Sequence, residues 1–513
     1  MNDNLHTTAG RKIFIALIVI AAVIAVILAP KAAVNVDEQL HYPHAKKVVN
    51  WYLTGGEDTS SLNTPVTNLK YYGQSVDNFT ALVNRVFDVQ DEFRVRHYTG
   101  AFFFIMMLII TGLLAREVSG SWLLASGTVI ALICMPRLSG QAFGNLKDIP
   151  FAVGYTAGVL FILRSLKAFP YIRWKTIILL GLTIAFTVSV RAGGFILFAY
   201  LGLVYLSYFV LKPALFLSFL KRQDIFQRLV LQGITVISLG YFAGLIFWPY
   251  ALQKIFVHPF ESLQVMEHYK VSIRQVFNGK LMWSTDLPWY YLPKWMLIST
   301  PLILLTGFLI YSVDFIRRFL IHLQINKQTL SEAFVIFTFI FPFVYVIVID
   351  SNLYSGIRQM LFIFPIFSMM AVWGTYKLVI PFLKVSKKVY YTVIILILVI
   401  LVWPISHSFK TFPADYIYFN AIAGGNPKAW GNYEYDYYYH SIKEAVDYLT
   451  TYIQDDEEVI VAMNNNLSNY FDHSDNITYQ YTRYPERSSF DWDYGIFGLN
   501  YLEPDFLKRG LWN

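Results

Sequence analysis

The sequence predicts a polytopic α-helical membrane protein that ends in a small α/β unit. Of its 513 residues, 56% are apolar and only 15% are charged, whereas an ordinary soluble domain carries about 25% charged residues. Apolar runs long enough to cross a bilayer recur from residue 13 to residue 406. The single cysteine, Cys134, lies inside one of these runs, which excludes a disulfide framework.

We expect eleven transmembrane helices from these runs. The first covers residues 13–29 and has no small-residue cleavage site before Pro30-Lys31, so we interpret it as an uncleaved span rather than a signal peptide. The other predicted spans cover residues 97–115, 121–137, 150–166, 174–190, 194–211, 229–249, 294–313, 333–349, 357–379 and 389–406.

The distribution of Lys and Arg predicts the orientation in the membrane. With a cytoplasmic N-terminus, the inside loops hold most of the basic residues, and the short outside connections hold Arg137, Lys147 and Arg191. Because basic residues gather in cytoplasmic loops, we expect the N-terminus inside and the C-terminus outside. These loops also explain the net charge of +7, so no nucleic-acid partner is expected.

This orientation divides the chain into a transmembrane core and an extracytoplasmic tail. The core covers residues 1–406 and includes two long outer loops, residues 30–96 and 250–293. The tail, residues 407–513, is more polar. It contains an amphipathic helical pattern near residues 440–452 and strand patterns at residues 459–463 and 477–482, which predict a small α/β unit.

An acidic pair, Asp37-Glu38, opens the first outer loop a few residues after the first span. Two interpretations stay open at this point: a helix N-cap with a favourable dipole charge, or carboxylates that act on a substrate at the membrane surface. After Pro43 the sequence predicts an amphipathic helix lying on the membrane. His41 and His44 could face a metal, but the proline between them favours solvated or substrate-facing histidines.

Other ionisable residues lie at the outer ends of the predicted spans and not near their middles. This argues against an ion-coupled transporter, which usually needs charges near the midplane. Asp148 is compatible with a helix cap before Pro150, and Arg191 with snorkelling to lipid headgroups. Arg358 is costly inside a span unless it is paired, and phosphate is a natural partner for its guanidinium.

Several motifs follow one another in an order that resembles a known family. They are the acidic pair after the first span, Lys147-Asp148-Ile149-Pro150-Phe151, the loop 283–293 with Pro288-Trp289-Tyr290-Tyr291, Arg358, and the tail segments 416–420, 424–425 and 435–437. This order resembles the GT-C superfamily of membrane glycosyltransferases, and within it the dolichyl-phosphate-mannose protein mannosyltransferase type with its bacterial relatives. The chain departs from that pattern at Arg358-Gln359, where members often have Arg-Tyr.

The resemblance implies transfer of a sugar from a polyprenyl-phosphate donor to an acceptor glycan, lipid or protein on the outer face, with inversion in a single displacement. It implies Asp37 as the base, Glu38 and Asp148 as residues that orient hydroxyl groups or hold a metal, and Arg358, then Arg191, as ligands of the donor phosphate. Whether a divalent metal takes part stays open. Residues expected to line the substrate site are His41, His44, Trp283, Asp286 and Tyr290. On composition alone, the aromatic residues among them fit membrane-interface anchors better than sugar-stacking platforms.

Three other classes compete with this interpretation: an outer-face polysaccharide polymerase or ligase, a flippase or other transporter of lipid-linked sugars, and an inactive scaffold of the same fold. Polymerases and ligases typically place their large outer loop late in the chain, whereas here a long loop comes first. A transporter would need a polar path through the spans. The tail resemblance and the lack of eukaryotic retrieval signals favour the inner membrane of a bacterium.

Overall fold

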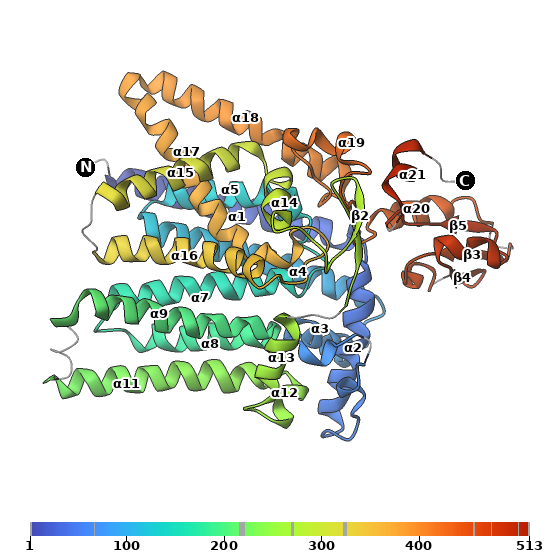
Figure 1. Cartoon of the computed structure of the whole chain (residues 1–513), viewed down its shortest axis with the longest axis horizontal. Coiled ribbons are helices and arrows are strands. Elements are labelled where there is room, and N and C mark those ends of the chain that lie inside the picture. Colours follow the sequence, from blue (N-terminus) through green and yellow to red (C-terminus); the bar gives the residue numbers. More distant parts are fainter. Residues whose placement is uncertain are drawn as a thin grey trace.

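The computed structural model describes residues 3–65, 67–214, 221–267, 271–321, 326–454, 457–472, 474–500 and 502–510. Its main body is a bundle of long helices that lie side by side (Figure 1). These are α1 (Asp3–Leu28), α4 (Glu92–Ser119), α5 (Trp122–Ile133), α7 (Asp148–Ala168), α8 (Trp174–Val190), α9 (Ile196–Leu211), α11 (Gln223–Ser238), α15 (Leu302–Ile321), α16 (Lys327–Val348), α17 (Phe364–Val385) and α18 (Lys387–Thr411).

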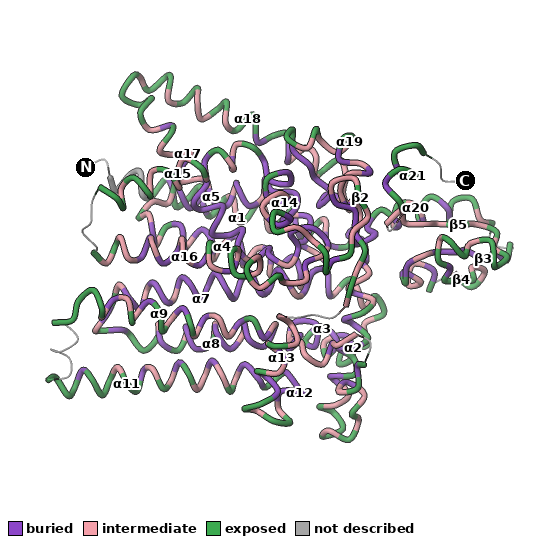
Figure 2. Tube along the Cα trace, viewed as in Figure 1, coloured by how far each residue is buried: buried purple, intermediate pink, exposed green. Residues whose placement is uncertain are grey.

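The helices confirm the predicted polytopic class. Within the described ranges, eight helical segments are long and apolar enough to cross a membrane, and α5 and α8 are shorter apolar helices. Each of the eleven predicted spans overlaps one bundle helix. Buried residues run through the interior of the bundle, whereas the outward faces of α11 and α18 are largely exposed (Figure 2), as expected for helices that face lipid.

The predicted span 294–313 is wrong in its bounds. The structure divides it into α14 (Tyr291–Ser299) and α15, and α15 continues to Ile321. Between them Thr300 is extended, with φ −107° and ψ 138°, because a residue before a proline is pushed out of the helical region. The following residue is Pro301.

Two helices of the bundle touch through their backbones. A Cβ atom added to Gly374 of α17 would lie 1.8 Å from the carbonyl oxygen of Gly307 in α15. Glycines therefore permit this close crossing, as small residues commonly do between membrane helices.

The helix after the acidic pair begins earlier than predicted. It is α2 (Val36–Leu53), which starts before Asp37 and contains Pro43 in its interior. Asn35 and Glu38 fix this start as a capping box: Glu38 N donates to Asn35 Oδ1 at 3.0 Å, and Asn35 N donates to Glu38 Oε2 at 3.2 Å. The prediction of a helix only after Pro43 was therefore wrong. Figure 1 shows α2 running across the end of the bundle rather than along it.

The long polar segments gather at this same end of the bundle, which we call the polar end (Figure 1). It carries α2, the hairpin of β1 (Arg274–Phe277) and β2 (Lys280–Trp283), and the chain after α18. Its smaller elements are α3 (Ser75–Val86), α6 (Pro136–Ser139), α12 (Pro249–Gln253), α13 (His258–Glu267) and α19 (Gly425–Ala429). The common location agrees with the sequence-based expectation that these segments share one side.

The last hundred residues divide into two parts. Residues 416–438 belong to the main core, where Tyr416, Phe419 and Tyr438 are buried. A second core contains Ile442 and Val446 with apolar residues of the following strands. This unit comprises α20 (Ser441–Leu449), β3 (Val459–Met463), β4 (Ile477–Tyr481), β5 (Tyr494–Ile496) and α21 (Pro504–Arg509), with a parallel sheet in the order β4-β3-β5. The predicted small α/β unit is confirmed.

Candidate active site

Asp37 lies at the centre of a charged cluster at the polar end. Its Oδ2 accepts hydrogen bonds from Arg358 Nη1 at 3.0 Å and from Lys147 Nζ at 3.3 Å. The Asp37 side chain is 26% exposed, whereas Arg358 is 5% exposed and Lys147 12%. The three residues come from the first turn of α2, the turn before α7 and the start of the 3₁₀ segment η6 (Arg358–Ile363). Folding therefore joins segments that are far apart in the sequence.

The cluster keeps its members charged. Burial alone would raise the pKa of Asp37, but the positive charges of Arg358 and Lys147 outweigh it, so the pKa lies below its usual value. Burial would lower the pKa of Lys147, but the negative charges of Asp37 and Asp148 raise it. At neutral pH an ionised carboxylate is thus shared by two cations.

Arg358 is surrounded by aromatic rings. Its guanidinium carbon lies 5.2 Å from the ring centre of Tyr354, 5.8 Å from that of Tyr437 and 5.1 Å from that of Tyr438, distances typical of cation–π contacts. Its Nε is buried and has no hydrogen-bond partner within the part of the chain that the structure describes. The guanidinium therefore retains an unused donor.

The turn that carries Arg358 is fixed from the β1 side. Gly356 N donates to Tyr291 Oη at 3.0 Å, and Tyr291 Oη donates to Gln275 Oε1 at 2.5 Å. Gln275 in turn donates to the carbonyl oxygen of Leu353 at 3.0 Å. This chain of hydrogen bonds holds the backbone just before Arg358.

Asp148 and Arg191 form a second ion pair beside the first. Arg191 Nη1 donates to Asp148 Oδ1 at 2.7 Å, so Arg191 has a protein partner rather than only lipid headgroups. Asn145 Nδ2 donates to Asp148 Oδ2 at 3.0 Å and also lies 3.0 Å from Tyr438 Oη. Asp148 is thereby linked to the same tail tyrosine that contacts Arg358.

Glu38 has a different environment from its neighbour. It is 1% exposed and accepts a hydrogen bond from Arg96 Nε at 3.1 Å, with His97 Nε2 at 3.4 Å. Arg96 Nη2 also donates to Asp77 Oδ1 at 2.7 Å. Burial would raise the pKa of Glu38, but His97 and Arg96 lower it. Glu38 therefore stabilises the start of α2 as the N3 residue of the capping box, with Asn35 as the N-cap, whereas the Asp37 carboxylate faces the cations.

His41 is neutral and supports Lys147. Its Nε2 lies 3.2 Å from Lys147 Nζ, and its Nδ1 lies 2.9 Å from Gln74 Oε1. An ammonium group can only donate, so Nε2 accepts and Nδ1–H donates to Gln74. Burial and the charge of Lys147 lower the pKa of His41 to about 4. Burial likewise lowers the pKa of His44, to about 3.

The described ranges contain no group of three or more His, Cys, Asp or Glu side chains placed to hold a metal ion. The crevice around Asp37, His41, Lys147 and Tyr438 has a volume of only about 10 Å³, roughly the room that one water needs. This crevice is therefore too small to hold a sugar, although the Asp37 side chain itself is 26% exposed.

The other predicted lining residues lie on the hairpin and the loop after it. Trp283 is 47% exposed, and its ring lies 5.4 Å from the guanidinium of Arg274. Tyr290 is 39% exposed and contacts Phe277 at 6.1 Å between ring centres, and Asp286 N donates to the Trp283 carbonyl at 3.0 Å. Among the interactions of the described residues, none joins these three side chains to Asp37.

Sequence reasoning missed several residues of this cluster. Lys147 was counted as a loop charge and as part of the Lys147-Asp148 motif, but not as a residue of the site. Tyr438 follows directly on the tail segment 435–437, and Arg96 lies directly before the predicted span 97–115. Gln74 stands in the middle of a long polar loop and gave no signal.

The fold and the site together define a polytopic helical membrane protein with a buried cluster of alternating charges at one end of its bundle. No family model matches the chain, and no curated protein matches it.

Solved structures with a similar arrangement include ArnT from Cupriavidus metallidurans. In the apo state its identity is 16%, over 71% of this chain and 59% of that one, with a TM-score of 0.41. Bound to undecaprenyl phosphate, its identity is 14%, over 72% and 60%, with a TM-score of 0.42. An Archaeoglobus fulgidus oligosaccharyltransferase in complex with zinc and sulfate has 14% identity over 87% and 60%, with a TM-score of 0.42. The chain spans about three fifths of the length of these proteins.

Proposed function

We propose that the chain is a glycosyltransferase that moves a sugar from a polyprenyl-phosphate donor to an acceptor at the outer face of the membrane. The observation that carries the proposal is the shared carboxylate: Arg358 and Lys147 both hold Asp37 Oδ2. Two cations face one carboxylate at the polar end of a membrane bundle, where a lipid headgroup would lie. The excess positive charge suits a phosphate.

Arg358 is the principal ligand that we propose for the donor phosphate. Its guanidinium offers a planar set of donors that suits phosphate oxygens, and its buried Nε lacks a partner among the described residues. Lys147 supplies a second positive charge at the same Asp37 oxygen. Arg191, which is 23% exposed in its pair with Asp148, is the second candidate ligand for the phosphate.

Asp37 is the proposed base, and donor binding would prepare it. In the arrangement described, Arg358 and Lys147 hold its pKa low, which makes a weak base. A phosphate that competes for the same two cations loosens their hold on Asp37 and raises its proton affinity. Donor binding and base activation are thereby coupled through two shared side chains.

The reaction then proceeds as a single displacement. The acceptor hydroxyl loses its proton to Asp37 while its oxygen forms a bond to the anomeric carbon, and the bond from that carbon to the phosphate oxygen breaks. Arg358 and Lys147 stabilise the charge that remains on the leaving polyprenyl phosphate. Attack opposite the leaving group inverts the anomeric configuration.

Glu38, Asp148 and His41 are positioning residues in this proposal. Glu38 caps α2 and thereby sets the direction of Asp37. Asp148 holds Arg191 and, through Asn145, Tyr438. Neutral His41 accepts from Lys147. His44, Trp283, Asp286 and Tyr290 remain candidates for the substrate path.

The proposal is tested with the purified full-length chain, a panel of polyprenyl-phosphate sugars that differ in the sugar, and a mixture of acceptors that carry hydroxyl groups. The readout is free polyprenyl phosphate, with NMR of the product for its anomeric configuration. We expect release from one or a few donors and an inverted product. The proposal is overturned if the folded protein releases polyprenyl phosphate from no donor, or if it carries lipid-linked sugars across a vesicle membrane unchanged.

A further inference from the structure

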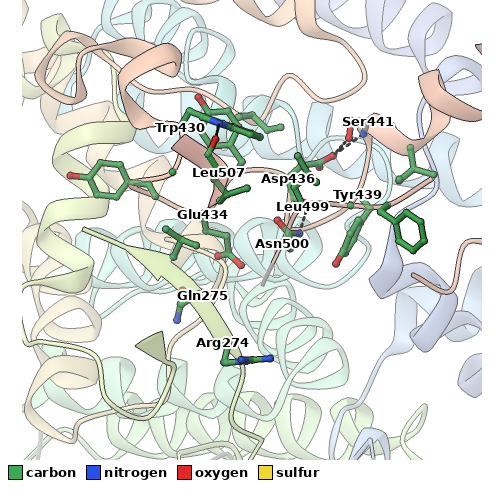
Figure 3. Close-up of a pocket in the computed structure, with 18 of the residues that line it drawn as sticks. Arg274, Gln275, Trp430, Glu434, Asp436, Tyr439, Ser441, Leu499, Asn500 and Leu507 are labelled. Carbon is green, nitrogen blue, oxygen red and sulfur yellow. Dashed lines mark hydrogen bonds between the residues drawn. The ribbon is translucent and has the colours of Figure 1, made fainter. Parts of the chain in front are cut away.

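A separate cavity lies between the hairpin, the segment 430–441 and the C-terminal α/β unit (Figure 3). Its volume is about 340 Å³, within the range of roughly 300–1,000 Å³ typical of small-ligand sites. It shares no lining residue with the crevice around Asp37. The cavity is therefore a second site and not an extension of the first.

Glu434 faces this cavity with an unsatisfied carboxyl group. Glu434 as a whole is 7% exposed, and its Oε2 is buried without a hydrogen-bond partner among the described residues. Figure 3 shows its side chain pointing between Gln275 and Arg274. A buried polar atom without a partner is costly, so a ligand that donates a hydrogen bond there removes that cost.

Neighbouring polar groups in the lining are already engaged. Ser441 N donates to Asp436 Oδ2 at 2.9 Å, and Asn500 Nδ2 donates to the Asp436 carbonyl at 2.8 Å. Gln275 Oε1 accepts from Tyr291. They shape the cavity, while the Glu434 carboxyl remains available to a ligand.

The electrostatics favour a neutral ligand with hydroxyl groups. Burial raises the pKa of Glu434 to about 7, against the lowering effect of Arg358 and Arg137. Near neutral pH its carboxyl group can therefore both donate and accept. The positive charges of Arg358 and Arg137 disfavour a cationic ligand, and the ionised fraction of Glu434 disfavours an anionic one.

The apolar part of the lining is aromatic. Trp430, Tyr433, Tyr435 and Phe497 contribute to the wall. Aromatic side chains join a large apolar face to a polar handle, which matches the C–H faces and hydroxyl groups of a sugar ring. A carboxyl group beside aromatic rings is thus suited to a saccharide.

The position of the cavity connects it to the proposed chemistry. Glu434 lies on the same short segment as Tyr437 and Tyr438, whose rings lie 5.8 and 5.1 Å from the Arg358 guanidinium. One side of this segment faces the cavity, and the other faces the cations around Asp37. The segment that lines the cavity therefore also contacts the proposed phosphate ligand Arg358.

We propose that this cavity binds the acceptor as a neutral saccharide, with a sugar hydroxyl hydrogen-bonded to the Glu434 carboxyl group. The assignment of the saccharide as acceptor rests on the proposed glycosyltransferase function. The cavity, its unpartnered carboxyl group and its aromatic wall are independent of that function.

The test applies the detergent-solubilised full-length chain to an array of immobilised neutral oligosaccharides. We expect the wild type to be retained, Glu434→Leu to weaken retention by about tenfold or more, and Glu434→Gln to keep part of it because the amide still offers a hydrogen-bonding oxygen. Glu458→Gln, at an exposed carboxylate of the neighbouring α/β unit, is the matched control and should behave as wild type.

The saccharide proposal is overturned if no neutral glycan retains the wild type, if both Glu434 variants bind as the wild type does, or if only charged glycans or peptides are retained. Release of polyprenyl phosphate by the same wild-type preparation separates the two proposals. Release without glycan retention removes the saccharide site and leaves the transferase. Glutamate-dependent retention without release removes the transferase and leaves the saccharide site.

Discussion

Arg358 Nη1 donates a hydrogen bond to Asp37 Oδ2 at 3.0 Å, although the two residues are 321 positions apart in the sequence. The contact joins the start of η6 to the first turn of α2, and Lys147 approaches the same oxygen from the turn before α7. The residue proposed to bind the donor phosphate is thus the residue that keeps the proposed base ionised. One ion pair couples donor recognition to proton transfer.

Replacement of Arg358 tests the phosphate role. We expect Arg358→Ala to raise the donor concentration for half-maximal rate by about ten- to a hundredfold, because a hydrogen bond to a charged group contributes about 1.5–3 kcal/mol. Arg358→Lys should restore part of the loss, since it keeps the charge but not the planar fork. Steady-state kinetics measure this, with Arg483→Ala at a 70% exposed side chain as control. An unchanged donor dependence in Arg358→Ala argues against phosphate binding.

Glu38→Ala should act mainly on stability. It removes one half of the capping box and leaves Arg96 with Asp77 as its remaining buried carboxylate. Breaking a buried pair costs about 3–5 kcal/mol, so thermal unfolding in detergent should begin well below the wild-type temperature. Asp37→Asn keeps the shape of the side chain and an oxygen that can accept from Arg358, so it should lower the unfolding temperature less than Glu38→Ala does. A fully stable but inactive Glu38→Ala would instead indicate direct participation in the reaction.

The lowered pKa values of His41 and His44 should make the folded chain less stable in mild acid. Burial lowers their pKa values from 6.5 to about 4 and about 3. As pH falls below 6.5 the unfolded chain binds protons that the folded chain does not, so folding stability decreases until the folded pKa is reached. For His41 the loss amounts to about 3 kcal/mol between pH 6.5 and 4. Asp37, whose pKa is lowered from 3.8, reduces folding stability only at a pH below this range.

Unfolding temperatures measured between pH 7 and 4 check this assignment. His41→Gln should remove about half of the loss of folding stability that is attributed to His41 and His44. It removes one of these two titrating histidines. Burial raises the pKa of Glu434 to about 7, so protonation of that carboxyl group offsets part of the decline. The assignment is therefore contradicted if His41→Gln and the wild type lose stability equally across this interval.

Site-directed labelling tests the proposed orientation. Cys134 is buried, so Cys134→Ser provides a thiol-free background with little change on the surface. A membrane-impermeant maleimide added to intact spheroplasts should label Glu458→Cys, in the C-terminal unit, and not Lys387→Cys, at the exposed start of α18. The reverse pattern would place the polar end, and with it the Asp37 cluster, in the cytoplasm.

Much of the bundle could be predicted from the sequence because a membrane requires long apolar helices. The prediction failed where a proline divided an apolar run, between Ser299 and Leu302. It failed again at α2, where Pro43 was taken as the start of the helix. The pattern of Asn35 and Glu38 is that of a capping box and already marked the true start.

The site was only partly predictable. The charge bias suggested that Asp37, Asp148, Arg191 and Arg358 share one face, and the structure places all four in two adjacent ion pairs. Which carboxylate pairs with which cation depends on tertiary packing and leaves no periodic signal. The contribution of Tyr438 required the tail to pack back onto the core, which composition alone does not show.

The comparison of wild type with Asp37→Asn in the donor-release assay tests the central claim most directly. Both proteins are purified at full length, matched by unfolding temperature, and incubated with the donor that the wild type uses. We expect Asp37→Asn to release polyprenyl phosphate about 10²–10⁴-fold more slowly, the usual contribution of a general base. Asp58→Asn, at a half-buried loop carboxylate outside the cluster, should stay at the wild-type rate. Release by Asp37→Asn at the wild-type rate would contradict the account.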